Sequence, residues 1–104
     1  MKILEDFIER MDSTLEEAET YITKAHLYKD ENKKVADAYA NASETHLNLY
    51  MKMHETVVAL INEERRKGVS VPVGMMEAWN LQHSILVKKF TKLKYLVDEY
   101  GKSY

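Results

Sequence analysis

The chain has 104 residues, 15 Lys and Arg against 17 Asp and Glu, and 45% hydrophobic residues. This length and balance predict one soluble domain, 1–104, and exclude a disordered segment, while the net charge of −2 gives no general attraction to nucleic acid or an anionic membrane. The chain contains no cysteine, which excludes disulfides, thiolate zinc sites and thiol nucleophiles.

The first predicted helix covers residues 2–28. Its apolar residues recur with alternating four- and three-residue spacing, the pattern of an amphipathic helix. The stripe consists of Leu4, Ile8, Met11, Leu15, Ala18, Ile22 and Ala25. The segment "STLE" at 13–16 could start a new helix as a capping box, but the stripe continues through it in phase. We therefore expect one continuous helix, ended by the polar segment 29–34, with Asp30 as the N-cap of the next helix.

The second predicted helix covers residues 31–67. Its main stripe is Val35, Tyr39, Ala42, His46, Leu49, Met53, Thr56 and Leu60. A second row widens the apolar face enough to contact two neighbouring helices, and consists of Leu47, Met51, His54, Val58 and Ile61. Basic residues at 65–67 followed by Gly68 are typical of a helix C-terminus.

The third predicted helix covers residues 74–100. Its stripe is Met75, Trp79, His83, Leu86, Phe90, Leu93, Val97 and Tyr100. The segment "VSVPV" at 69–73 is the one strand-like signal, and Pro72 argues against a central strand there. The fold class is therefore all-α. Sustained four-three spacing in three helices joined by short connections predicts an antiparallel three-helix bundle with coiled-coil-like packing.

The predicted hairpin end at 59–82 extends beyond the first helix, because the second helix is longer. At 1.5 Å per residue it should project by roughly 10 Å. Methionines and a tryptophan on such an end are typical of a protein-binding surface; the alternative is a small core that the loop closes through Val71 and Val73. The candidate partner-binding residues are Ile61, Val71, Val73, Met75, Met76 and Trp79.

Two groups of opposite charge should lie side by side, since the first and third helices are expected to be parallel. The acidic group is Asp6, Glu9, Asp12 and Glu16, and the basic group is Lys88, Lys89, Lys92 and Lys94. The lysines are the one candidate basic patch. We expect a solvated face, partly neutralised by the acidic helix, and regard nucleic-acid binding as the least favoured function.

The histidines are the residues most suited to site chemistry. The helix alignment places His54 and His83 within about one turn of each other, and His46 near Asp12 and Glu16. His26 lies beside the polar break and is expected to be exposed.

A di-metal carboxylate bundle needs Glu-x-x-His motifs, but the residues three positions before His46, His54 and His83 are Ser43, Met51 and Asn80. We therefore expect hydrogen-bonded histidines and no cofactor. The alternative left open is a single metal ion held by His54, His83 and a carboxylate of Glu5 or Glu9. There is no glycine-rich phosphate loop and no nucleophile elbow, so we expect no enzymatic activity.

The segment 38–100 carries a loose family resemblance. The residues concerned are "AYANASETHLNLYMKMHETVVALINEERRKG", a Val-Pro turn and "MMEAWNLQHSILVKKFTKLKYLVDEY". They resemble small all-helical accessory proteins encoded by bacteriophages and prophages of Gram-positive bacteria, which also look ferritin-like in helix arrangement. Ser43 and Asn80 stand where the ferritin ligand set has glutamate, which leaves that set incomplete.

The resemblance suggests a phage accessory protein and no particular activity. Together with the projecting apolar end, it leads us to expect a non-enzymatic protein that binds another protein. By analogy with small phage proteins, the target could be a host protein or a defence nuclease, as for an anti-CRISPR inhibitor. We also expect a homodimer. The expected location is the cytoplasm, or the host cytoplasm if the chain is phage-encoded, because no apolar run is long enough for a membrane span. The alternatives are a ferritin-like metal-binding protein that uses His54 and His83, and a structural or assembly factor of a virion.

Overall fold

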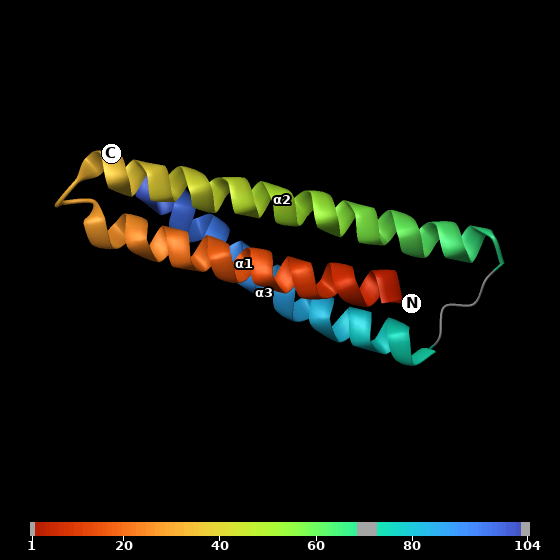
Figure 1. The fold of residues 1–104 in the computed structure, drawn as a ribbon. Coiled ribbons are helices and arrows are strands. Elements are labelled where there is room, and N and C mark those ends of the chain that lie inside the picture. Colours follow the sequence, from red (N-terminus) through yellow and green to blue (C-terminus); the bar gives the residue numbers. More distant parts are fainter. Residues whose placement is uncertain (1, 69–72, 103–104) are drawn as a thin grey trace.

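The computed structural model describes residues 2–68 and 73–102. These residues form three helices and no strand: α1 (Lys2–Tyr28), α2 (Lys33–Arg66) and α3 (Val73–Lys102). The helices lie side by side in a rod of 56 × 21 × 18 Å, with α1 and α3 parallel and α2 antiparallel to both (Figure 1). The predicted all-α three-helix bundle is confirmed, and each helix begins and ends within two residues of its predicted bounds.

The connection between α1 and α2 is a short turn with a defined cap. The backbone amides of Glu31 and Asn32 both donate to the carbonyl of Tyr28, at 3.0 and 2.9 Å. Asn32 is extended, and its side-chain oxygen accepts a hydrogen bond of 3.2 Å from the amide of Val35. The predicted cap at Asp30 is therefore wrong, because the chain first closes the end of α1 and only then starts α2.

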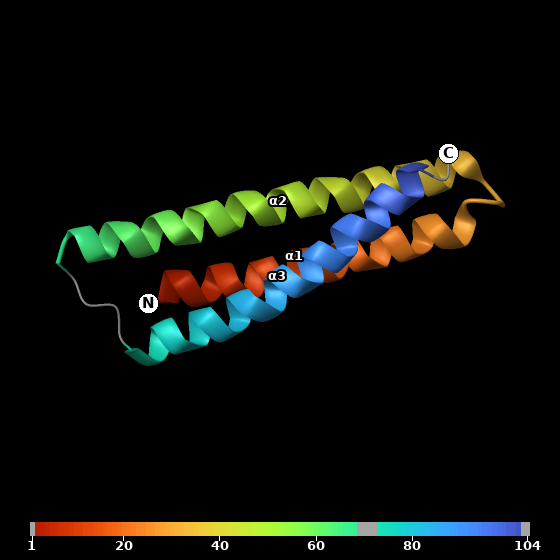
Figure 2. The same cartoon turned by 180° about the vertical axis from the view of Figure 1, so that it is seen from behind.

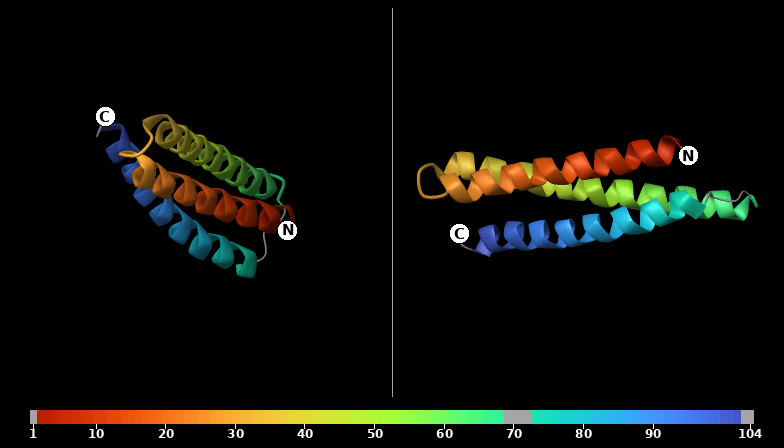
Figure 3. Two further views of the ribbon diagram at one scale, coloured as in Figure 1. Left: turned by 60° about the vertical axis from the view of Figure 1, so that its left-hand side comes forward. Right: turned by 90° about the horizontal axis from the view of Figure 1, so that it is seen from below.

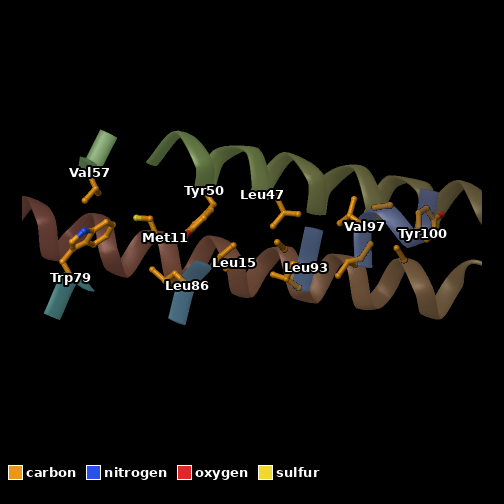
Figure 4. Packing of buried hydrophobic residues seen from close by; sticks show 14 of the residues in the cluster. Met11, Leu15, Leu47, Tyr50, Val57, Trp79, Leu86, Leu93, Val97 and Tyr100 are labelled. Atoms are coloured by element: carbon orange, nitrogen blue, oxygen red, sulfur yellow. The ribbon is translucent and has the colours of Figure 1, made fainter. Parts of the chain in front are cut away.

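The buried stripes of α1 and α3 follow the predicted pattern. Almost the whole stripe of α1 is fully buried, and α1 is continuous through 13–16. On α3 the buried residues are Trp79, Leu86, Leu93, Val97 and Tyr100. Figure 4 shows these side chains meeting those of α2 along one core.

The predicted main stripe of α2 is wrong. Val35 and Leu49 of that stripe are 41% and 47% exposed. The buried residues of α2 are Ala36, Ala40, Ser43, Leu47, Tyr50, Val57 and Ile61. Because α2 packs against two helices, its buried face lies between the two predicted rows, and it includes small residues that a hydrophobicity pattern undervalues.

The α1–α2 seam, the line of contact between these helices, is the closest packed of the three, and α2 and α3 contact each other least. Ser43 is completely buried there, and its hydroxyl donates a 2.7 Å hydrogen bond to the carbonyl of Ala18. Small side chains at this level let the two backbones approach closely. In the left view of Figure 3, α1 lies between α2 and α3, which agrees with the weaker α2–α3 contact.

The C-terminal turns of α2 extend past the N-terminal end of α1, as Figures 1 and 2 show from opposite sides. Beyond this point α3 is the one described helix that lies beside α2. Within the described helices, no stretch combines the length and apolar character that crossing a membrane requires.

Candidate functional site: the groove between α2 and α3

Two hollows lie along the contact between α2 and α3, and together they form the α2–α3 groove. The first, of about 210 Å³, is lined by Val58, Ile61, Asn62, Arg65, Met76, Trp79 and Asn80. The second, of about 200 Å³, is lined by Tyr50, Met51, His54, Glu55, Val87 and Phe90.

Both hollows open on the same side of the molecule. The rim of α2 is formed at positions 51, 55, 58, 62 and 65, whose four-three spacing places these residues on one face of the helix. The rim of α3 is formed at positions 76, 80 and 87, which also share a face. The hollows are therefore parts of one groove.

A histidine pair joins the two helices in this groove. The Nε2 atoms of His54 on α2 and His83 on α3 are 2.7 Å apart, and both rings are partly buried. The predicted proximity of these two residues is confirmed. Because a hydrogen bond between two nitrogens needs one donor and one acceptor, the neutral rings must carry their protons on opposite nitrogens.

Aromatic rings surround the pair. Trp79 stacks on His83 with ring centres 5.0 Å apart, and Tyr50 stacks on Phe90 at 5.1 Å. Burial lowers the pKa of His54 below its usual value, and the nearby His83 lowers it further, while the carboxylate of Glu55 acts in the opposite direction. His54 is therefore biased toward its neutral form.

The carboxylate expected for a metal ion does not join this pair. Glu5 and Glu9 are exposed, and among residues 2–68 and 73–102 no three His, Asp or Glu side chains are grouped so that they could hold an ion. Tetrahedral zinc with bonds of 2.0–2.1 Å would hold two nitrogens roughly 3.3 Å apart. The observed 2.7 Å between the nitrogens is the distance of a hydrogen bond.

The other two histidines contact residues that the sequence did not indicate. Nε2 of His46 lies 2.7 Å from a carboxylate oxygen of Glu17, the residue that follows the expected neighbour Glu16. His26 is partly buried, with Nε2 at 3.3 Å from the carbonyl of Leu96, and the expectation that it is exposed is wrong.

The predicted partner-binding residues have mixed positions. Ile61 and Trp79 are each only 5% exposed, because α2 and α3 cover most of their surface, and Met76 is partly buried. All three line the first hollow. Val71 lies outside the described residues, as do the side chains of Val73 and Met75.

Sequence analysis missed the exposed apolar residues of the groove rim as a set. Met51 and Val58 were assigned to the interior, yet they are exposed, and so is Val87 on the facing helix. On α2, Met51 and Val58 share a four-three spacing with the polar rim residues Glu55, Asn62 and Arg65, and this spacing was the available sign of an exposed face. It could be recognised only once the rotation of α2 was known.

The acidic group of α1 and the basic group of α3 lie on helices that run parallel, as expected. Among the described side chains, no ion pair joins the two groups, and Lys94 contacts Asp98 of its own helix at 3.2 Å. Exposed pairs contribute only about 0–1 kcal/mol, so they do not impose a contact between helices.

Comparison with known proteins gives no match: no family model, no curated protein and no solved structure resembles this chain significantly.

Proposed function

We propose that this chain is a non-enzymatic protein that binds another protein through the α2–α3 groove. The observation that carries the proposal is the exposure of Met51, Val58 and Val87 beside two hollows on one side of the bundle. Pockets that enclose small molecules usually measure about 300–1,000 Å³. Hollows of about 200 and 210 Å³ suit single anchoring side chains of a protein partner better.

The partner segment we propose is an amphipathic helix. The hollows are offset by about seven residues along α2, as from Met51 to Val58 or from Glu55 to Asn62. At 1.5 Å per residue this is about 10 Å, the distance between positions i and i+7 of a docked helix. Such a helix would lie against α2 and α3 on the side away from α1, completing a four-helix arrangement.

The rim residues specify the partner's polar positions. Glu55 borders one hollow and Arg65 borders the other. A partner helix with a basic residue near Glu55 and an acidic residue near Arg65 would be complementary, and such charges at a rim favour register and association rate more than affinity.

The wider role we propose rests on the sequence resemblance to phage accessory proteins. In that role the chain acts in a host cytoplasm, occupying the surface of a host protein such as a defence nuclease, in the manner of an anti-CRISPR inhibitor. A homodimer formed through the same groove, or assembly into a virion, would use the same apolar surface. The experiment below separates these outcomes.

The test compares two valines of nearly equal exposure. Val58 lies on the groove rim and is 38% exposed, whereas Val35 lies elsewhere on α2 and is 41% exposed. Tagged wild-type protein, Val58→Glu and Val35→Glu are used to capture proteins from an extract of the producing cells. A specific partner should be retained by wild type and Val35→Glu, and lost with Val58→Glu, for which we expect at least about tenfold weaker binding.

Sedimentation of the same three proteins identifies the kind of partner. A wild-type dimer that Val58→Glu alone converts to monomer would show that the occupant is a second copy, and larger assemblies that grow with concentration would favour the virion role. If Val58→Glu retains every wild-type partner with unchanged affinity, the groove is not the binding surface.

A further inference from the structure

We propose that His54 and His83 form a proton-operated contact that holds α2 and α3 together and opens the α2–α3 groove when both rings become charged. The inference does not rest on the proposed partner, because it concerns the two helices of the free protein.

The geometry of the pair makes the contact depend on a single shared proton. The Nε2 atoms are 2.7 Å apart, whereas the ring centres are 4.8 Å apart, so the two nitrogens point toward each other. The rings are inclined by only 26°. One ring donates its Nε2–H to the lone pair of the other, and no second hydrogen can fit between these nitrogens at this distance.

Two successive protons have opposite effects on this contact. The first binds Nδ1 of the donor ring, which becomes an imidazolium and keeps its Nε2–H pointing at the neutral partner, so the hydrogen bond becomes charge-assisted. The second proton must take the accepting Nε2 lone pair. It removes the hydrogen bond and leaves two positive rings in contact, so the pair separates.

The groups around the pair do not offset two charges. From α2, the carboxylate of Glu55 favours protonation of His54 but is exposed and screened by solvent, and the Tyr50 ring is 6.3 Å away. From α3, Trp79 stacks on His83 and carries no charge. No charged group of α1 contributes to the titration of His54, for which burial is the largest effect.

Opening of the pair would change the groove at its centre. His54 lines the second hollow, and Trp79, stacked on His83, lines the first. Because α2 and α3 contact each other less than either contacts α1, this hydrogen bond is one of a few direct contacts between them, with the Tyr50–Phe90 stack and the Tyr100–Asp37 hydrogen bond. Loss of the histidine contact lets His83 leave Trp79 and exposes the indole to water.

Trp79 is the single tryptophan of the chain, so its fluorescence reports on the surroundings of this one side chain. The emission maximum and the far-UV circular dichroism are measured together from about pH 8 to pH 4, a range that spans the usual titration of histidine. For the wild type we expect a red shift of the emission maximum on acidification while the helix signal is unchanged.

Two variants remove one of the two charges. His54→Gln and His83→Gln can each keep a hydrogen bond to the remaining histidine but cannot form a doubly charged pair, so we expect the red shift to be lost. His46→Gln is the control, since His46 contacts Glu17 on the α1–α2 side and should leave the shift intact.

Three results would overturn the inference. The first is an emission maximum that stays constant in the wild type, and the second is a red shift in His54→Gln or His83→Gln as large as in the wild type. The third is a red shift that coincides with loss of the helix signal. Long-range ¹H–¹⁵N spectra of the neutral protein add an independent readout. They should show opposite tautomers for His54 and His83, and identical tautomers would contradict the shared proton.

Discussion

The two seams on either side of α2 differ in how closely the helices approach each other. On the α1 side, Ser43 is buried and donates directly to the backbone of Ala18, which requires the helices to be close. On the α3 side, the contact is made by the His54–His83 pair and stacked aromatic rings, with hollows on both sides of the pair. The α1–α2 seam is therefore closed at the level of Ser43, and the α2–α3 seam is partly open at the level of the histidine pair.

This difference separates stability from the candidate function. The closed seam tolerates no added volume at Ser43, and it supplies the rigid pair α1–α2. An open seam with a polar pair and exposed rim residues contributes less to the free energy of unfolding, and it leaves apolar surface available to a partner. The following variants test that contrast.

The largest effect is expected from added volume in the closed seam. Ser43→Leu should lower the free energy of unfolding by about 1–3 kcal/mol, because the larger side chain must push α1 and α2 apart. Val87→Leu adds volume at the rim of the open seam and should change the free energy of unfolding by less than about 0.5 kcal/mol. Urea denaturation of both variants measures the difference, and equal losses would show that the two seams are packed alike.

Tyr50 provides a test in the opposite direction. Its hydroxyl is buried and has no hydrogen-bond partner among the described residues, and burial raises its pKa above the usual value. Tyr50→Phe removes this unsatisfied group and should stabilise the protein by about 1 kcal/mol. Thermal unfolding of Tyr50→Phe provides the measurement, and a clear loss of stability would mean that the hydroxyl is satisfied.

Tyr100→Phe is the control for Tyr50→Phe, because it removes a hydroxyl that has a hydrogen-bond partner. The Tyr100 hydroxyl donates to the carboxylate of Asp37 at 2.6 Å. Lys33 and then Tyr100 hold the pKa of Asp37 below its usual value. Tyr100→Phe should therefore destabilise the fold slightly and raise the pKa of Asp37. An NMR titration of the Asp37 carboxyl would detect the change, and an unchanged pKa would contradict this contact.

The open seam should also make stability depend on pH. The pKa of His54 is lowered in the folded protein from its ordinary value of 6.5. The unfolded chain therefore binds more protons below that pH, and the stabilisation by neutral His54, fully present above pH 6.5, is lost as the pH falls toward the folded pKa. His54→Gln should flatten this part of the stability profile, measured by denaturation at several pH values. A profile identical to wild type would contradict the assignment.

The smallest effect is expected for Val58→Glu in the absence of a partner. The side chain is exposed at the rim, so its replacement should change the free energy of unfolding by no more than about 0.5 kcal/mol. A larger loss would show that Val58 belongs to the core and would remove its use as a probe of binding.

The sequence was sufficient for the helices and for the meeting of His54 with His83, because periodicity and helix length determine both. It was not sufficient for the rotation of α2 about its axis. The hydrophobicity of Val35 and Leu49 predicts burial, but both are exposed. Ser43 is polar but buried, and its hydroxyl donates a hydrogen bond to the backbone of α1. The candidate site depends on that rotation, since it decides that Met51 and Val58 border the groove.

The cap at Asn32 illustrates a second limit of sequence analysis. Both Asp30 and Asn32 are good capping residues, and the choice depends on how many residues the turn uses to satisfy the carbonyl of Tyr28. The burial of Ile61 and Trp79 also follows from the position of α3 against α2 rather than from the sequence of either helix.

Native-state hydrogen exchange tests the contrast between the seams most directly. If α1 and α2 form the stable pair and α3 is held more weakly, the α3 amides from about 79 to 97 should exchange through a partial opening of lower free energy than the best-protected amides of α1 and α2. Equal protection of all three helices would show that α3 unfolds only with the whole molecule, and the open-seam account would then be wrong.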